Sequence, residues 1–143
     1  MDVFDLARRL VNTTPAKILQ KAIDKPEVKD AIIELNTEKQ LGELNEDSTG
    51  TKLYQIGGQY SVYTQRVKNL GGKDVNLNDT GAYYDSYRVV VLGNGDYAID
   101  SNSTIHGDDL EDRYGDKLEG LNKENEIIIK KLIEKKYLQD LLR

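Results

Sequence analysis

The only histidine of the chain, His106, is the side chain best suited to proton transfer near neutral pH. Ser101, Ser103 and Asp108 lie close to it in the sequence and are the residue types of a serine hydrolase. Nearness in sequence does not supply triad geometry, and an acidic loop is a poor support for a base that must stay in register. A small hydrolase that uses His106 or the acidic cluster beside it is therefore the less favoured alternative, and a solvated loop histidine is the favoured interpretation.

A second candidate chemistry is cation binding by the segment from Asp74 to Asp85. Asp74, Asn76 and Asn78 have the spacing of the oxygen ligands in an EF-hand loop. The sixth position of such a loop needs Gly for its sharp turn, and here that position is Asp79. The twelfth position is Asp85 rather than a bidentate Glu, so we favour a turn that Asn and Asp side chains stabilise by hydrogen bonds.

The acidic run at residues 108–112 is the third candidate. Its carboxylates belong to Asp108, Asp109, Glu111 and Asp112. They have the residue types of a divalent-cation patch, but acids at the start of a short helix are explained by the helix dipole. Neither Gly57-Gly58 nor Gly71-Gly72 has the spacing of a phosphate loop or a dinucleotide fingerprint. We therefore predict no catalytic residue, no cofactor and no metal ligand in this chain.

The elements that must position these residues begin with two short helical stretches in residues 3–23. Pro suits the first turn of a helix, so Thr14-Pro15 marks the start of the second stretch. We treat residues 1–25 as an N-terminal helical arm and residues 26–143 as a single α+β domain. The domain is predicted to contain helices at 26–47 and 61–70, a hairpin at 87–101 and a C-terminal helix at 123–142.

Local sequence signals define the predicted helices of the first half. Val28, Ile32 and Leu35 recur at three-to-four-residue spacing, which gives the helix at 26–47 one apolar stripe. Ser61 is expected to cap the next helix, and Gly71-Gly72 is expected to stop it. The residues of that helix expected to face inward are Val62, Tyr63 and Val67.

The second half of the chain changes to strand periodicity. Val89-Val90-Val91 and Tyr97-Ala98-Ile99 flank Gly93-Asn94-Gly95, which predicts a hairpin. Residues 80–87 indicate a turn that leads into it, and Asn122 is expected to cap the final helix. The fold class is therefore α+β, with N-terminal helices, a central antiparallel hairpin or small sheet, and a long C-terminal helix packed on it.

Composition narrows the function classes. The 143 residues can bury a core without disulfides, and the absence of Cys removes thiolate chemistry. No apolar run approaches the roughly 20 residues of a membrane span, and charged residues interrupt the N-terminal segment where a signal peptide needs an apolar stretch. A net charge of −5 argues against bulk nucleic-acid binding. We therefore expect a soluble intracellular protein with no nucleic-acid specificity and no membrane contact.

Charge is unevenly distributed along the second half. The acids of its first part are Asp96, Asp100, Asp108, Asp109, Glu111, Asp112, Asp116 and Glu119. The cations of the last 21 residues are Lys123, Lys130, Lys131, Lys135, Lys136 and Arg143. Patches of opposite sign on one small domain suit head-to-tail contact between copies, and the alternative is two ordinary solvated faces.

The aromatic set is also unusual, with nine Tyr, one Phe and no Trp. Tyr combines an apolar ring with a polar tip, so it suits surfaces that become buried only on assembly. Tyr83, Tyr84 and Tyr87 cannot all face one side of a single element. We therefore expect at least one to be an interface residue, and the alternative is that they are semi-buried core aromatics.

One block of residues carries a family resemblance. Thr80, Gly81, Tyr83, Ser86 and Tyr87 are followed by Val89 and Val91 in a strand, Tyr97-Ala98 in the next and Tyr114-Gly115 later. Over roughly residues 74–142 this pattern resembles the tail-completion and head–tail joining (neck) proteins of tailed bacteriophages. The run of Tyr60, Ser61, Thr64, Lys68 and Gly72 is also similar to small structural proteins of Bacteroidota phages.

The resemblance implies a non-enzymatic virion component that forms a ring at the neck or tail. Its implied partners are copies of itself, the portal or connector, and tail proteins, after assembly in the host cytoplasm. The predicted interface residues are Tyr83, Tyr84, Tyr87, Asp108, Asp109, Glu111, Asp112, Lys130, Lys131, Lys135 and Lys136. A small monomeric binding or regulatory module remains the alternative function, ahead of the hydrolase.

Overall fold

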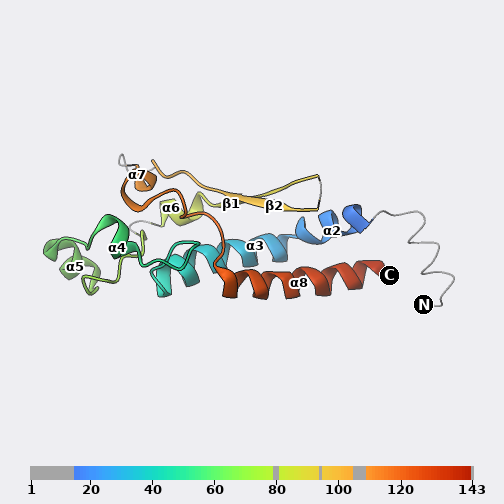
Figure 1. Cartoon of the computed structure of the whole chain (residues 1–143), viewed down its shortest axis with the longest axis horizontal. Coiled ribbons are helices and arrows are strands. Elements are labelled where there is room, and N and C mark those ends of the chain that lie inside the picture. The colour runs from blue at the N-terminus through green and yellow to red at the C-terminus, as the bar shows by residue number, and fades with distance from the viewer. Residues whose placement is uncertain (1–14, 79–80, 94, 105–108, 143) are drawn as a thin grey trace.

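Helices pack on one face of a two-stranded antiparallel sheet, which makes the fold α+β as the sequence predicts. The computed structural model describes residues 15–78, 81–93, 95–104 and 109–142. Figure 1 shows an elongated molecule with α5 (Val62–Lys68) at one end. The start of α2 (Pro15–Ile23) and the C-terminal end of α8 (Lys123–Leu141) lie at the other end.

The remaining elements lie between these ends. They are α3 (Pro26–Glu34), the π-helix η1 (Leu35–Glu43), α4 (Leu53–Gly57), α6 (Ala82–Asp85), β1 (Arg88–Val91), β2 (Tyr97–Asp100) and α7 (Leu110–Tyr114). In the sheet Val89 lies opposite Ile99, as expected for the predicted hairpin. The predicted caps are also confirmed, since Ser61 accepts a hydrogen bond from Thr64 N and Asn122 accepts one from Asn125 N.

Three local predictions are wrong in detail. The helical segment that begins at Pro26 is an α-helix only to Glu34 and continues as the π-helix η1 to Glu43. The stretch between the predicted helices at 26–47 and 61–70 contains the short helix α4, which was not predicted. The block expected to be a turn contains α6, which begins after Gly81 in the left-handed region at φ 83°.

The predicted N-terminal arm is not separate where the structure describes it. Ile18, Ala22 and Ile23 of α2 are buried. Ala22 and Ile23 belong to one core cluster with Ile32 of α3 and Ile129 of α8. The boundary at residue 25 therefore does not divide two packing units. A second core cluster lies near α4, α6 and α7 and contains Leu53, Tyr83, Tyr87, Tyr114 and Leu118.

Three buried amide side chains, which we call the amide clamp, hold η1 against the start of α8. Asn36 Nδ2 donates to Leu118 O at 3.0 Å, and Asn36 Oδ1 accepts from Gly120 N at 2.8 Å. Gln40 Nε2 donates to Gly120 O at 2.8 Å, and Gln40 Oε1 accepts from Asn122 N at 2.8 Å.

The third member of the amide clamp, Asn125, completes the network from α8. Its Nδ2 donates to Gln40 Oε1 at 3.2 Å and to Leu35 O at 3.4 Å. Asn36 and Gln40 have no exposed surface, and Asn125 is 1% exposed. Because buried polar groups are costly unless they are paired, this network specifies how the two distant segments meet.

Gly57 marks a close approach between α4 and α7. A Cβ atom at this position would lie 2.5 Å from the ring of Tyr114 and 2.8 Å from Arg113 O. Arg113 Nε donates to Gly57 O at 2.9 Å, which fixes the approach. No residue with a side chain fits here without moving one helix.

We expect Asn36→Ala and Gln40→Ala each to lower the free energy of unfolding by about 3 kcal/mol, because each leaves buried backbone groups of the segment 118–122 without partners. Urea unfolding measures the change. Gln139→Ala, at an exposed position of α8, is the control and should stay within about 0.5 kcal/mol of the parent chain. Equal stability of Gln40→Ala and Gln139→Ala would contradict the role given to the amide clamp.

We expect Gly57→Ala to destabilise the fold by about 1–3 kcal/mol, because its Cβ overpacks the contact between α4 and α7. Gly93→Ala is the matched control, since a Cβ there meets nothing within 4 Å. Thermal unfolding of both variants checks the difference, and a Gly57→Ala chain as stable as Gly93→Ala would show that the two helices do not approach this closely.

Candidate interaction surfaces

The tyrosines predicted to be interface residues are largely internal. Tyr83 is 1% exposed and Tyr87 is 5% exposed, so the interface prediction is wrong for both. Their spacing of four residues places them on one side of the helical turn at α6, where their hydroxyls share a hydrogen bond of 2.9 Å. Tyr84 is partly buried, and its hydroxyl donates to Asn76 O. The alternative, that these residues are core aromatics, describes them.

Burial changes the acidity of these phenols. It raises the pKa of Tyr83, Tyr84, Tyr87 and Tyr114 above the ordinary value, because the phenolate would lose its hydration. The pKa of Tyr97 is raised to about 12, first by burial and then by the charges of Glu126 and Asp96. None of these tyrosines has the lowered pKa of a catalytic base.

Two acidic side chains that flank α7, Asp109 and Glu119, accept hydrogen bonds from nearby groups. Asp109 Oδ1 accepts from Glu111 N at 3.0 Å and from Ser103 Oγ at 2.9 Å, so this carboxylate caps α7. Ser101 Oγ donates to Glu119 Oε1 at 2.6 Å. The pKa of Glu111 is raised, chiefly by the neighbouring charge of Glu119 and then by burial. The hydroxyls of Ser101 and Ser103, the serines weighed for a hydrolase, therefore donate to Glu119 and Asp109.

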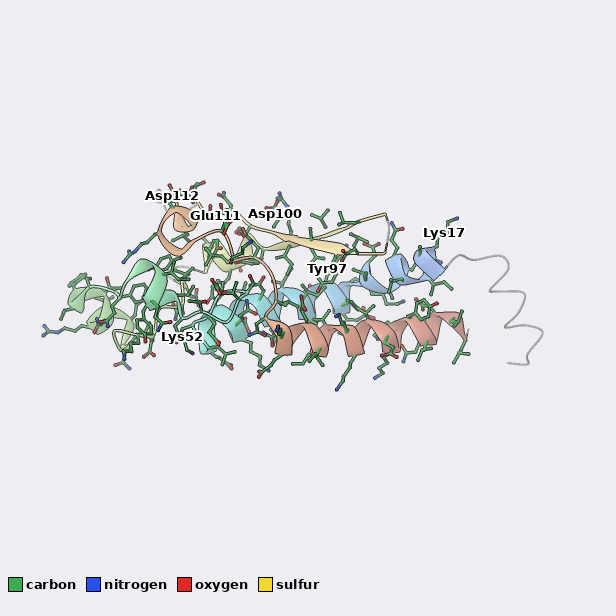
Figure 2. All side chains as sticks on the ribbon, in the orientation of Figure 1. Lys17, Lys52, Tyr97, Asp100, Glu111 and Asp112 are labelled. Carbon is green, nitrogen blue, oxygen red and sulfur yellow. The ribbon has the colours of Figure 1, made fainter. Side chains whose placement is uncertain are left out.

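The remaining acidic predictions fall in different places. Asp112 is exposed on α7, and Figure 2 shows it with Glu111 at the α7 end of the molecule. Asp108 and His106 lie outside the described residues. Within the four ranges that the structure describes, no group of three or more acidic or histidine side chains could hold a metal ion.

The segment with EF-hand-like spacing forms hydrogen-bonded turns, as the sequence favours. Asp74 Oδ2 accepts from Gly71 N at 2.8 Å, and Asn76 Oδ1 accepts from Asn78 N at 2.9 Å. The hydroxyl of Tyr60 accepts from Leu77 N at 2.9 Å. These oxygens hold the backbone of the segment in place.

The basic residues of α8 divide into two groups. Lys130, Lys131 and Lys135 are exposed. Lys136 is half-buried and forms an ion pair with Glu27 of α3 at 3.3 Å. Lys136 therefore joins α8 to α3 within one chain, and the other three remain candidates for contact with another chain.

The seven residues of α5 are arranged opposite to expectation. Val62, Tyr63 and Val67 are 64%, 78% and 67% exposed, so the prediction that they face inward is wrong. The half-buried residues of this helix are all polar, namely Thr64, Gln65 and Lys68. They turn inward because they have partners there: Gln65 Nε2 donates to Tyr60 O at 2.8 Å, and Lys68 Nζ donates to Asn78 O at 3.1 Å. We call the outward residues Val62, Tyr63 and Val67 the α5 face.

An apolar hollow lies toward the opposite end, between α2, the hairpin and α8. Its volume is about 520 Å³, and we call it the hairpin groove. Its apolar lining residues are Ala16, Leu19, Ile23, Tyr97, Ile133 and Tyr137, and its charged ones are Asp96, Lys130 and Glu134. Tyr97 lies between the hairpin and α8 (Figure 2). A smaller hollow of about 270 Å³ shares Tyr97 and Ile133 and continues along α8 past Ile129.

The chain matches no family model, no curated protein and no solved structure. Its candidate surfaces are therefore judged by geometry alone. Among the helices of the described ranges, none combines the length and the apolar character needed to cross a membrane. Two apolar features of the described surface, the α5 face and the hairpin groove, are explained by neither core packing nor a helix cap.

Alkaline pH should destabilise the protein through its buried tyrosines. Above about pH 10 an unfolded chain loses phenol protons that the folded chain retains, so the free energy of unfolding falls as pH rises toward the folded pKa values. Urea unfolding at several pH values measures this slope. Tyr87→Phe should reduce the slope by up to about 1.4 kcal/mol per pH unit, since one group is removed. An unchanged slope would show that Tyr87 ionises equally well in the folded chain.

Proposed function

We propose that this chain is a structural protein of a bacteriophage neck or tail, of the tail-completion or ring-forming type. It acts by binding other copies of itself into a ring, and by binding portal or connector and tail proteins. The proposed location is the virion, with no catalytic role. The observation that carries the proposal is the outward apolar face of α5 at one end of an elongated chain whose other end contains an apolar groove.

Exposed apolar surface of this kind favours a protein that works in contact with other chains. Solvated helices normally place polar residues outward, whereas α5 places Val62, Tyr63 and Val67 there. Interfaces are rich in aromatic residues, and Tyr63 is the most exposed residue of the α5 face. Two unlike surfaces on one chain support head-to-tail contacts, which close into rings when the rotation between copies permits.

Charge adds a second, weaker attraction. Lys130, Lys131 and Lys135 are exposed on α8, while Glu111 and Asp112 lie on α7 toward the other end of the long axis. In a head-to-tail arrangement these opposite charges approach each other. Exposed ion pairs are weak individually and are screened by salt, so they orient the contact more than they hold it.

The hairpin groove also favours a second candidate, a monomeric binding or regulatory module. A volume of about 520 Å³ lies within the roughly 300–1,000 Å³ of small-molecule pockets, and the lining is mainly apolar. Such a module stays monomeric at high concentration, whereas a ring-forming protein associates. The oligomeric state therefore separates the two candidates.

We expect sedimentation velocity to show association that increases with protein concentration and weakens at high salt. Lys131→Glu should weaken it by roughly two- to fivefold, the effect of losing one exposed ion pair. Lys39→Glu, an exposed position on η1 with the same charge change, is the control and should associate like the parent chain. Electron microscopy of the associated fraction should show rings, and a chain that stays monomeric in every condition would rule out the proposal.

A further inference from the structure

The α5 face and the hairpin groove lie toward opposite ends of the long axis (Figure 1). A chain cannot seat its own α5 in its own groove, because the body of the molecule separates them. Both surfaces are apolar, one protruding and one hollow. The α5 face of one copy can therefore pack against the hairpin groove of another. A pair joined in this way still has one free α5 face and one free groove, to which further copies can bind.

The α5 face has the properties of an inserted element. Its seven residues form a helix about 10 Å long, at 1.5 Å per residue. Tyr63 is 78% exposed and stands between Val62 and Val67 on the outward side. Buried Tyr residues at the centre of an interface are among those that contribute most to binding, and one can bury roughly 150–250 Å².

The hairpin groove has the properties of a receiving element. Its lining comes from three separate elements, with Leu19 on α2, Tyr97 on β2 and Ile133 on α8. The smaller hollow that continues along α8 lengthens the apolar floor. Helices are commonly bound in grooves by anchors at helical spacing, and Tyr63 and Val67 have the required spacing of four residues.

Charges at the margins of the two surfaces are complementary. Arg66 is exposed beside Tyr63 and Val67 on α5. The hairpin groove carries the acids Asp96 and Glu134 against the single cation Lys130. With α5 in the hairpin groove, Arg66 would lie near a margin where acidic residues outnumber basic ones. This attraction favours one orientation of α5 over the reverse.

We infer that α5 of one copy inserts into the hairpin groove of the next copy, with Tyr63 as its anchor. This inference rests on the proposed function, because it specifies the contact through which the ring forms. Because α5 has only seven residues, we expect one such contact to bury less than the roughly 800 Å² per partner of a standard interface and to hold an isolated pair weakly. Ring closure holds each copy by two contacts and raises the overall affinity.

Engineered disulfides test the contact, because the chain has no cysteine of its own. Val67→Cys places a thiol on the α5 face, and Ala16→Cys places one in the lining of the hairpin groove. Under mild oxidation we expect a cross-linked dimer when the two single variants are mixed, and none from either variant alone. Gln139→Cys, exposed on α8 and outside the groove lining, is the control partner and should not cross-link with Val67→Cys.

Two other cross-linking results would overturn the inference. A dimer from Val67→Cys alone would mean that two α5 faces pair symmetrically. The second result is an intrachain disulfide in the double variant Leu6→Cys, Ala16→Cys, together with no cross-link between the single variants Ala16→Cys and Val67→Cys. It would mean that the N-terminal segment of the same chain occupies the groove.

A substitution on the surface of α5 separates this inference from the proposed function. Tyr63→Asp should weaken self-association at least about 30-fold, as expected for the loss of a principal anchor. Gln55→Asp, exposed on α4, should associate like the parent chain. Circular dichroism should be unchanged in both variants. If the parent chain associates and Tyr63→Asp associates equally well, the inference is overturned but the ring proposal stands. If the parent chain is monomeric, both are overturned.

Discussion

The amide clamp is the interaction on which the rest of the arrangement depends. Asn36 and Gln40 form hydrogen bonds to the backbone of residues 118–122, although the paired residues are 80 to 84 positions apart in sequence. Each donor and acceptor involved would be costly to bury alone. The clamp therefore positions the start of α8 against η1. From there α8 packs along α3 and α2.

The same network accounts for the π-helix. Wide helical turns are rare and short, so nine residues of η1 need compensation from outside the helix. Asn36, Thr37 and Gln40 are all buried there, and the two amides reach partners on another segment while Thr37 Oγ1 donates to Ile33 O at 2.7 Å. The conformation of η1 is thus a tertiary effect, stabilised by the segment it contacts.

Sequence signals that act within a few residues predict the local structure well. Asn122 and Ser61 cap helices, and Gly93 to Gly95 separates two strands, because each signal satisfies backbone groups that lie next to it. The π-helix was not predictable in this way, since the apolar spacing of α3 and η1 fits an ordinary helix and the partner of Gln40 lies beyond residue 117.

Two errors concern which side of a helix faces the core. Val62, Tyr63 and Val67 were correctly placed on one face of α5, but the pattern alone cannot say which face is inside when polar residues such as Gln65 have backbone partners there. Tyr83 and Tyr87 carried a usable signal that the prediction missed. Their four-residue spacing is that of one helical face, and it indicates a shared environment in the core.

The amide clamp also affects the geometry that a head-to-tail assembly of this chain would have. In such an assembly the rotation between neighbouring copies equals the angle between the inserted and receiving surfaces of one copy. In the proposed contact the receiving surface would be the groove between α2, β2 and α8, and the inserted surface would be α5, at the other end of the molecule. The amide clamp joins η1 to the start of α8 between these ends, so it contributes to that angle. If copies assemble head to tail as proposed, an internal constraint of this kind would favour one ring size, because another copy number would require a different angle between the two surfaces.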